Sequence, residues 1–268
     1  MAFLLLHNYT DFIDSWIKFN NNEHKNRKKI EEFINTIFSK SEKECLEAEI
    51  LVIAGDISHH NSISKLTIEV FSKYFNKVYV VLGNHDYYLI SKTQMRRYKA
   101  NSLNRIIELN DMLADNERVV LLHSAVNKVT DIYKGLRIAG CTMTSKPNTE
   151  EEISFYNGFM NDSRYIPNKV NDLNSMDMKS YEDIKEFKPD LFISHYPLLM
   201  TYSHKLHLHD GSNGSFLCKV DEHIAPINFF GHVHERGDYD IGSSFYTNAI
   251  GYKGELSNET IALKVINI

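Results

Sequence analysis

The first half of the chain alternates short apolar runs with longer segments whose apolar residues recur at helical spacing. The apolar runs predict β-strands at 3–9, 49–55 and 77–83. Two segments between them, 26–47 and 62–75, each place their apolar residues on one helical face. These residues are Ile30, Phe33, Ile34 and Ile37 in the first segment and Leu66, Val70 and Phe71 in the second. Strands joined by amphipathic crossover helices indicate a layered α/β fold.

The second half is richer in strands. Apolar runs predict them at 118–123, 136–142, 190–195, 227–232, 243–250 and 260–268. So many successive strands indicate a second sheet packed on the first, which predicts an α/β fold built as a two-sheet β-sandwich flanked by helices. Residues 143–189 are polar and predict a helical insertion, because apolar strands resume directly after them. We therefore expect residues 1–268 to form a single domain.

The composition narrows the class of protein. Of 268 residues, 43% are hydrophobic and 24% are charged, and the formal net charge is −5. This charge provides no basic field and argues against long nucleic acid as a partner. The three cysteines, Cys45, Cys141 and Cys218, have no CxxC spacing and fit reduced thiols. The first residues do not resemble a signal peptide and no run is long enough to span a membrane, so we expect a cytoplasmic protein without membrane contact.

Several apolar strands run directly into side chains that can bind a metal ion. These side chains are Asp11, Asp56, Asn84, His85, His195, His232 and His234. Ligands of open α/β sheets gather outside the carboxyl ends of the strands, so we expect these residues to converge. A glycine directly precedes three of these side chains: Gly55, Gly83 and Gly231. Glycine allows the backbone to turn sharply and a cation or phosphate to approach closely.

The residue types indicate the chemistry. Carboxylate, imidazole and amide oxygen without thiolate suit Mn, Fe, Zn, Co or Ni and do not resemble a structural zinc site. A carboxylate such as Asp56 can bridge two cations roughly 3.5–4 Å apart, the spacing of two-metal hydrolytic sites. A lone histidine at a strand end is more often a satisfied polar residue than a ligand, so the metal interpretation depends on the residues taken together.

Four motifs in order resemble the calcineurin-like metallophosphoesterase superfamily. They are GD at 55–56, GNHD at 83–86, the strand-end histidine at 195 and GHVH at 231–234, followed by NAIGY at 248–252. The resemblance covers nearly the whole chain and implies a four-layer α/β/β/α fold with two divalent metal ions, of which we favour manganese. It also implies the ligands: Asp56 bridging, Asn84, His195 and His232 on one metal, and Asp11 and His234 on the other.

The first motif departs from the family pattern. The family usually has DxH after the first strand, whereas this chain reads Asp11-Phe12-Ile13-Asp14 and lacks the histidine. One histidine inserted between Phe12 and Ile13 would restore the motif, so we hypothesise a single-residue deletion. Substitute ligands are His7, which lies upstream in the strand, and Asp14. Without a substitute, the first metal should bind more weakly. Asp11 itself has an alternative role as a helix or turn cap.

Further residues carry both a functional and a structural interpretation. The resemblance implies that His85 is a general acid that protonates the leaving oxygen, oriented by a carboxylate for which Asp86 is the candidate. His59 and His60 either line the rim of the site and contact substrate or begin a helix.

Other candidates lie further along the chain. Asn161, Asp162 and Arg164, in FMNDSRYI, either reach a substrate phosphate or cap a surface helix. The histidines of 203–210 are expected in a solvated loop near the pocket, and His123 is expected to be structural.

Two functions follow from these observations. The first is a metal-dependent phosphoesterase that hydrolyses a phosphate ester, by elimination a small phosphodiester such as a nucleotide. Protein phosphatases of the superfamily carry GDxxDRG where this chain has GDISHHN, which disfavours that branch. The alternative is a catalytically impaired protein that keeps the fold and binds metal and nucleotide without turnover.

Overall fold

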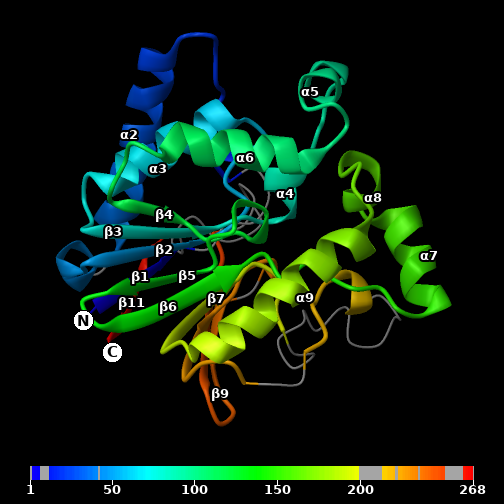
Figure 1. The fold of residues 1–268 in the computed structure, drawn as a ribbon. Coiled ribbons are helices and arrows are strands. Elements are labelled where there is room, and N and C mark those ends of the chain that lie inside the picture. Colours follow the sequence, from blue (N-terminus) through cyan, green and yellow to red (C-terminus); the bar gives the residue numbers. More distant parts are fainter. Residues whose placement is uncertain are drawn as a thin grey trace.

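Two β-sheets packed face to face form the centre of the protein, and helices cover their outer faces (Figure 1). This arrangement confirms the predicted two-sheet α/β fold. The computed structural model describes residues 2–6, 12–41, 43–198, 213–220, 223–234, 236–250 and 262–267. Among these residues, no helix is long and apolar enough to cross a membrane.

The first sheet is mostly parallel. Its strand order is β11 (Lys264–Asn267), β1 (Ala2–Leu6), β2 (Ile50–Ala54), β3 (Lys77–Val81) and β4 (Val119–Leu121). Strands β1 to β4 run parallel, and β11 pairs antiparallel with β1. Parallel neighbours require crossover connections, which the intervening helices provide.

The second sheet has a parallel centre and antiparallel edges. Its order is β5 (Thr130–Tyr133), β6 (Leu136–Cys141), β7 (Leu191–Ser194), β8 (Ile227–Phe229), β10 (Ser244–Asn248) and β9 (Arg236–Asp240). The edge strands β5 and β9 pair antiparallel with β6 and β10. The sequence predicted neither edge strand. Each of the other strands overlaps a predicted apolar run.

Apolar side chains fill the space between the sheets and beneath the helices. Val52, Val81, Ile193 and Phe229 belong to the layer between the two sheets. The helices α2 (Glu23–Lys40), α3 (Asn61–Ser72) and α6 (Ser102–Leu113) cover the first sheet. The helix α9 (Val170–Phe187) covers the second, where Tyr181 packs with Phe192. The predicted helical faces in 26–47 and 62–75 are confirmed, since their aliphatic residues are buried in the core.

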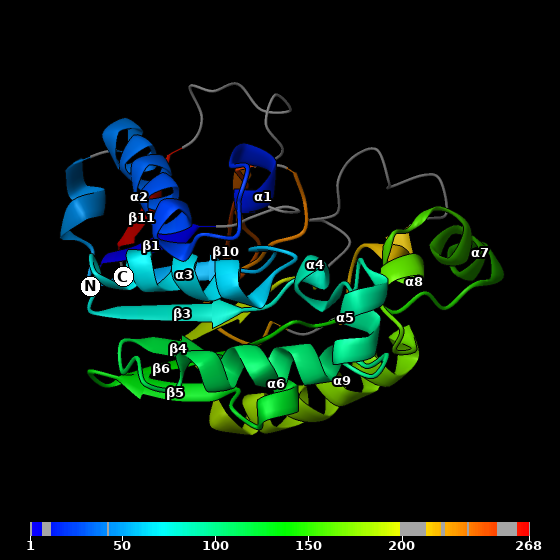
Figure 2. The same ribbon diagram turned by 90° about the horizontal axis from the view of Figure 1, so that it is seen from above.

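Shorter elements gather at the carboxyl ends of the central strands. They include α4 (Asn84–Tyr87), α5 (Lys92–Arg97), α7 (Glu150–Phe159) and α8 (Asp162–Tyr165), at the end opposite the chain termini (Figure 2). The remaining short elements are α1 (Phe12–Trp16), η1 (Lys43–Glu47), η2 (Ser124–Val126) and η5 (Asn213–Ser215).

The region predicted as a helical insertion, 143–189, has two parts. Because β6 and β7 are parallel neighbours, α9 is the crossover that connects them and belongs to the layered fold. The helices α7 and α8 precede it and extend beyond the sheet ends (Figure 1). We call residues 150–165 the α7–α8 segment.

Candidate metal centre

The Asp86 carboxylate holds together the loops that follow β2 and β3. Its Oδ2 accepts hydrogen bonds from the main-chain N–H groups of Asp56 at 2.7 Å and Gly83 at 2.9 Å, and its Oδ1 accepts one from Ile57 at 3.2 Å. Burial raises the pKa of Asp86, while nearby Arg105 and these N–H groups lower it. Both carboxylate oxygens therefore bind main chain. The expected role of Asp86 in orienting His85 stays a prediction.

Arg105 joins the same two loops from α6. This arginine is 1% exposed and donates to the carbonyl oxygens of Ser58, His85 and Tyr88 at 2.6, 3.1 and 2.8 Å. Its charge also offsets that of Asp86. Sequence analysis missed Arg105, because nothing in an amphipathic helix shows that one arginine points into the core.

Three of the predicted metal ligands lie together at the strand ends. Asp56, His195 and His232 are buried, and each presents a ligand atom within 4.8 Å of the others. The Oδ2 of Asp56 lies 3.4 Å from Nε2 of His195. The rings of His195 and His232 have centroids 5.2 Å apart and an interplanar angle of 69°. One carboxylate and two imidazoles at this spacing are a donor set that suits a divalent transition metal.

Asn84 adds an amide oxygen to this group. Its Oδ1 lies 3.0 Å from Nε2 of His195, and its Nδ2 donates to Oδ1 of Asp162 at 2.7 Å and to the Tyr88 hydroxyl at 3.2 Å. The ring of His195 is fixed from its other side, because Nδ1 lies 2.7 Å from the carbonyl oxygen of Ala54. A carbonyl oxygen only accepts, so Nδ1 carries the proton and Nε2 presents a lone pair toward Asn84 and Asp56.

Burial keeps His195 neutral. It is fully enclosed, and desolvation lowers its pKa to about 3. A neutral imidazole whose second nitrogen donates to a main-chain carbonyl is the usual state of a metal-ligating histidine.

Glycine is required where the loops meet. A Cβ added to Gly83 would lie 2.1 Å from Oδ1 of Asp56 and 2.4 Å from Cε1 of His195. Asp56 and His232 adopt left-handed backbone conformations, with φ of 59° and 70°. Such conformations are uncommon for residues with a side chain and often occur at functional sites. The close packing and the strained backbone together fit a preformed metal centre.

His85 lies beside this group and contacts a second histidine. Its Nδ1 is 3.0 Å from Nε2 of His59, and the two rings stack at 5.2 Å. The main-chain N–H of His85 donates to Oδ1 of Asp56 at 2.9 Å. Tyr88 packs against both rings, with centroids 4.2 Å from His85 and 5.6 Å from His59.

Two residues of the broken first motif, Ile13 and Asp14, are held by contacts outside the three clustered ligands. Ile13 is completely buried in the apolar core beneath the helices. The carboxylate of Asp14 accepts hydrogen bonds from the Ser58 hydroxyl at 2.9 Å and from the His59 main-chain N–H at 3.0 Å. Asp14 thus fixes the loop after β2. Asp11 and His7 lie outside the described residues.

The remaining candidates do not join the group in the described part of the chain. His234 is half-buried beyond β8. Asn161 and Arg164 are exposed, and Arg164 donates to the carbonyl of Gly158 within the α7–α8 segment. Their neighbour Asp162 is instead buried against Asn84.

Other histidines take structural positions or lie outside the description. His60 is exposed at the start of α3. His123 is structural, as expected: it is buried, and its Nδ1 accepts from the main-chain N–H of Ala125. The histidines of 203–210 lie outside the described residues.

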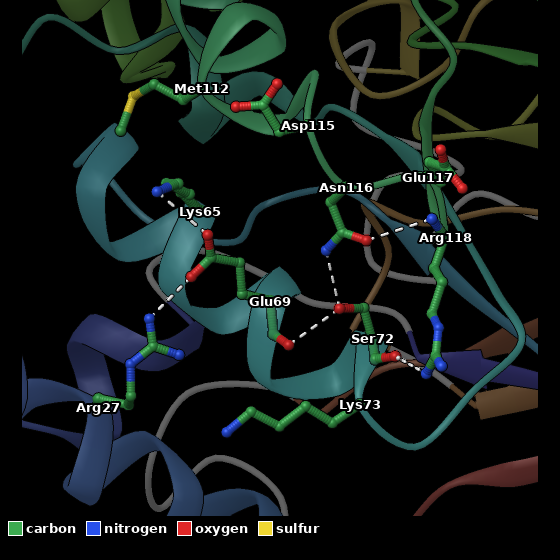
Figure 3. A pocket seen from close by; sticks show the side chains of 10 residues that line it. All are labelled: Arg27, Lys65, Glu69, Ser72, Lys73, Met112, Asp115, Asn116, Glu117 and Arg118. Carbon is green, nitrogen blue, oxygen red and sulfur yellow. Dashed lines mark hydrogen bonds and ion pairs between the residues drawn. The ribbon is translucent and has the colours of Figure 1, made fainter.

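A surface cavity of about 690 Å³ lies among α2, α3 and the residues that precede β4 (Figure 3). Arg27 and Lys65 in its wall both pair with Glu69, at 2.8 and 3.1 Å. Arg118 donates to the carbonyl of Ser72 at 3.0 Å. These charged groups stabilise the contact between α2, α3 and the start of β4 and are not part of the metal centre.

The chain matches the model of a known protein family. The model of the calcineurin-like phosphoesterases matches residues 7–236, most of the chain. The chain belongs to the calcineurin-like phosphoesterase family. Members of this family are metal-dependent phosphoester hydrolases, which agrees with the buried donors Asp56, His195 and His232.

One solved structure supports the fold of this calcineurin-like phosphoesterase. Phosphopantetheinyl hydrolase from Mycobacterium tuberculosis aligns with a TM-score of 0.63 and 16% identity over 82% of this chain and 86% of its own. A second solved structure aligns over 92% of this chain and 90% of its own, at 12% identity and a TM-score of 0.46. A search of curated proteins found no match.

Proposed function

We propose that this protein hydrolyses a small phosphodiester at a site that holds two divalent metal ions. The observation that carries the proposal is the convergence of Asp56, His195 and His232 within 4.8 Å of one another, at the carboxyl ends of the strands. The site therefore combines the donors and the location that metal-dependent phosphoester hydrolysis requires.

The donors around Asp56 divide into two sets in this proposal. Asn84, His195 and His232 bind one ion, Asp11 and His234 bind the other, and Asp56 is shared. The fit is best supported for the first set, because the lone pair of His195 Nε2, the Asn84 oxygen and an Asp56 oxygen face one another. Two divalent ions, of which we favour manganese, would supply Lewis acidity and screen the negative charge of the phosphoryl oxygens.

His85 is the general acid of the proposed reaction. Its backbone is fixed by the hydrogen bond to Asp56. In this proposal its imidazole would lie next to the scissile bond of a substrate held at the metals. His59, rather than Asp86, is the residue that contacts its Nδ1. We propose that His59 orients the His85 ring so that its other nitrogen donates a proton to the leaving oxygen.

Hydrolysis of model substrates tests the proposal. The chain with added MnCl₂ should hydrolyse bis-p-nitrophenyl phosphate faster than p-nitrophenyl phosphate, and Asp56→Asn should abolish both activities. Phosphopantetheinyl compounds belong in the same assay because the phosphopantetheinyl hydrolase shares the fold. Activity that survives both Asp56→Asn and metal removal would contradict a metal-dependent site built on Asp56.

A specific observation favours a second candidate, a binding protein with impaired turnover. Ile13 stands where the DxH motif of the family has histidine, and it lies in the apolar core while Asp14 binds the loop after β2. Neither residue supplies a donor to the clustered ligands, which would leave the first metal weakly bound.

Restoring the motif distinguishes the two candidates. A variant with histidine inserted between Phe12 and Ile13 should be compared with the unaltered chain at equal manganese concentration. Turnover by the inserted variant alone supports the binding protein. Equal turnover by both supports the enzyme.

A further inference from the structure

Asp162 is a buried carboxylate that the α7–α8 segment places beside the metal centre. It begins α8 and is 1% exposed. Its Oδ1 accepts hydrogen bonds from Nδ2 of Asn84 and from the Tyr88 hydroxyl, and its Oδ2 accepts one from the Tyr196 hydroxyl at 2.9 Å. Three donors from two different strand-end loops therefore meet on one carboxylate.

Each of these donors lies next to a residue of the proposed site. Asn84 is itself a proposed ligand. The Tyr88 ring packs on His85, with centroids 4.2 Å apart. Tyr196 directly follows His195, and its ring lies 4.3 Å from that of His232. Asp162 thus binds one proposed metal ligand, Asn84, and two tyrosines that pack against the proposed general acid and another proposed ligand.

We propose that Asp162 is a positioning residue that fixes the amide of Asn84 with its oxygen toward the metal. This inference rests on the proposed function. It makes the α7–α8 segment, which lies outside the layered fold, a necessary part of the metal centre.

The Asn84 side chain needs a hydrogen-bond acceptor beside its Nδ2 atom, because the two ends of its amide differ. Only the Oδ1 end of Asn84 can bind a cation, while the Nδ2 end carries two donors. In the observed orientation Nδ2 faces the carboxylate of Asp162 and Oδ1 faces His195. The flipped amide would place its oxygen against the Asp162 oxygens and its N–H groups toward the metal. A partner behind a ligand typically contributes 10–100-fold to metal affinity.

Calorimetric titration with MnCl₂ tests the proposal, with Asp177 as the matched control. Asp177, in α9, is also fully buried and also accepts three hydrogen bonds, from Ser124 and Thr144. Asp162→Ala should weaken manganese binding about 10–100-fold. Asp177→Ala should lower the melting temperature without changing the dissociation constant for manganese.

Conservative variants separate orientation from folding. Asp162→Asn keeps an oxygen that can accept from Asn84, so it should bind manganese within about threefold of wild type, given that it loses charge but not the acceptor. Tyr196→Phe should show a smaller loss than Asp162→Ala, because it removes one donor and leaves Asn84 bound. These two variants also serve if Asp162→Ala does not fold.

The outcomes distinguish this inference from the proposed function. Wild-type affinity in folded Asp162→Ala, or an equal loss in Asp177→Ala, would overturn the positioning role. Absence of manganese binding by the wild type would overturn it as well. Manganese binding that depends on Asp162, together with no hydrolysis of any phosphoester, would support the positioning role and contradict the proposed function.

Discussion

The Nδ1 atom of His195 donates a hydrogen bond to the main-chain oxygen of Ala54, at 2.7 Å. Ala54 ends β2 and His195 follows β7, so this bond connects the two sheets at their carboxyl ends. It also selects the tautomer in which Nε2 is free of a proton and faces Asp56. The contact between the sheets therefore holds His195 in the tautomer that a metal ligand at Nε2 requires.

His195→Ala should weaken manganese binding, because it removes the Nε2 atom that faces Asp56. We expect affinity to fall at least tenfold, together with any phosphoesterase activity. His123→Ala is the matched control, because His123 is equally buried but hydrogen-bonds to Ala125 and Tyr87, away from the clustered ligands. Calorimetric titration and thermal unfolding of both variants provide the measurement. Equal affinity losses would show that burial, and not ligation, explains the effect.

Stability without metal should fall as the pH drops below about 6.5. Burial lowers the pKa values of His123 and His195 to about 3, so the folded state binds fewer protons than the unfolded state between these limits. Each histidine should therefore reduce the free energy of unfolding by about 1.4 kcal/mol per pH unit below about 6.5. Urea unfolding at pH 7.5 and 5.5, in EDTA, measures the loss. His123→Asn should show a smaller loss than wild type, and identical losses would contradict the assignment.

Gly83→Ala should disrupt the centre. The new Cβ would overlap Oδ1 of Asp56 and the ring of His195, so one of them must move. We expect loss of manganese binding and a lower melting temperature. Gly158→Ala is the control, because a Cβ there meets no atom within 4 Å and the residue lies in α7. That change should stabilise the protein by up to about 1 kcal/mol.

His85→Ala and His59→Ala should slow turnover according to the leaving group. General acid catalysis typically accelerates a reaction by roughly 10²–10⁴-fold. The acceleration is smaller when the leaving group is the anion of an acidic alcohol such as p-nitrophenol. Both variants should therefore lose more activity toward a phenyl phosphodiester than toward a p-nitrophenyl phosphodiester. His59→Ala should retain manganese affinity, since it acts through the ring of His85. Equal losses on both substrates would argue against proton donation.

Sequence patterns predicted the residues that follow strands better than the residues that support them. Asp56, Asn84, His195 and His232 were found because parallel strands align their carboxyl ends, and each follows an apolar run. The partner of Asn84 could not be found in this way. Asp162 lies in a polar stretch, and only the packing of α8 shows that it is buried.

The main-chain partners of Asp86 could not be predicted for a related reason. The family resemblance suggested only that this carboxylate orients His85, whereas its position at α4, beside the main chain of Asp56 and Gly83, depends on how the two loops pack. The edge strands β5 and β9 escaped prediction because they are short and only partly buried. Pairing with a neighbouring strand, rather than apolar alternation, holds them in place.

The left-handed backbone at Asp56 and His232 makes thermal stability and the proposed function favour different residues at these positions. Glycine at either position would relieve the torsional penalty that a Cβ imposes there, so selection for thermal tolerance alone would favour it. A variant with glycine there would lose one of the side chains of the proposed metal centre. In relatives that were selected for heat resistance and have lost activity, we therefore expect glycine to replace Asp56 or His232 early.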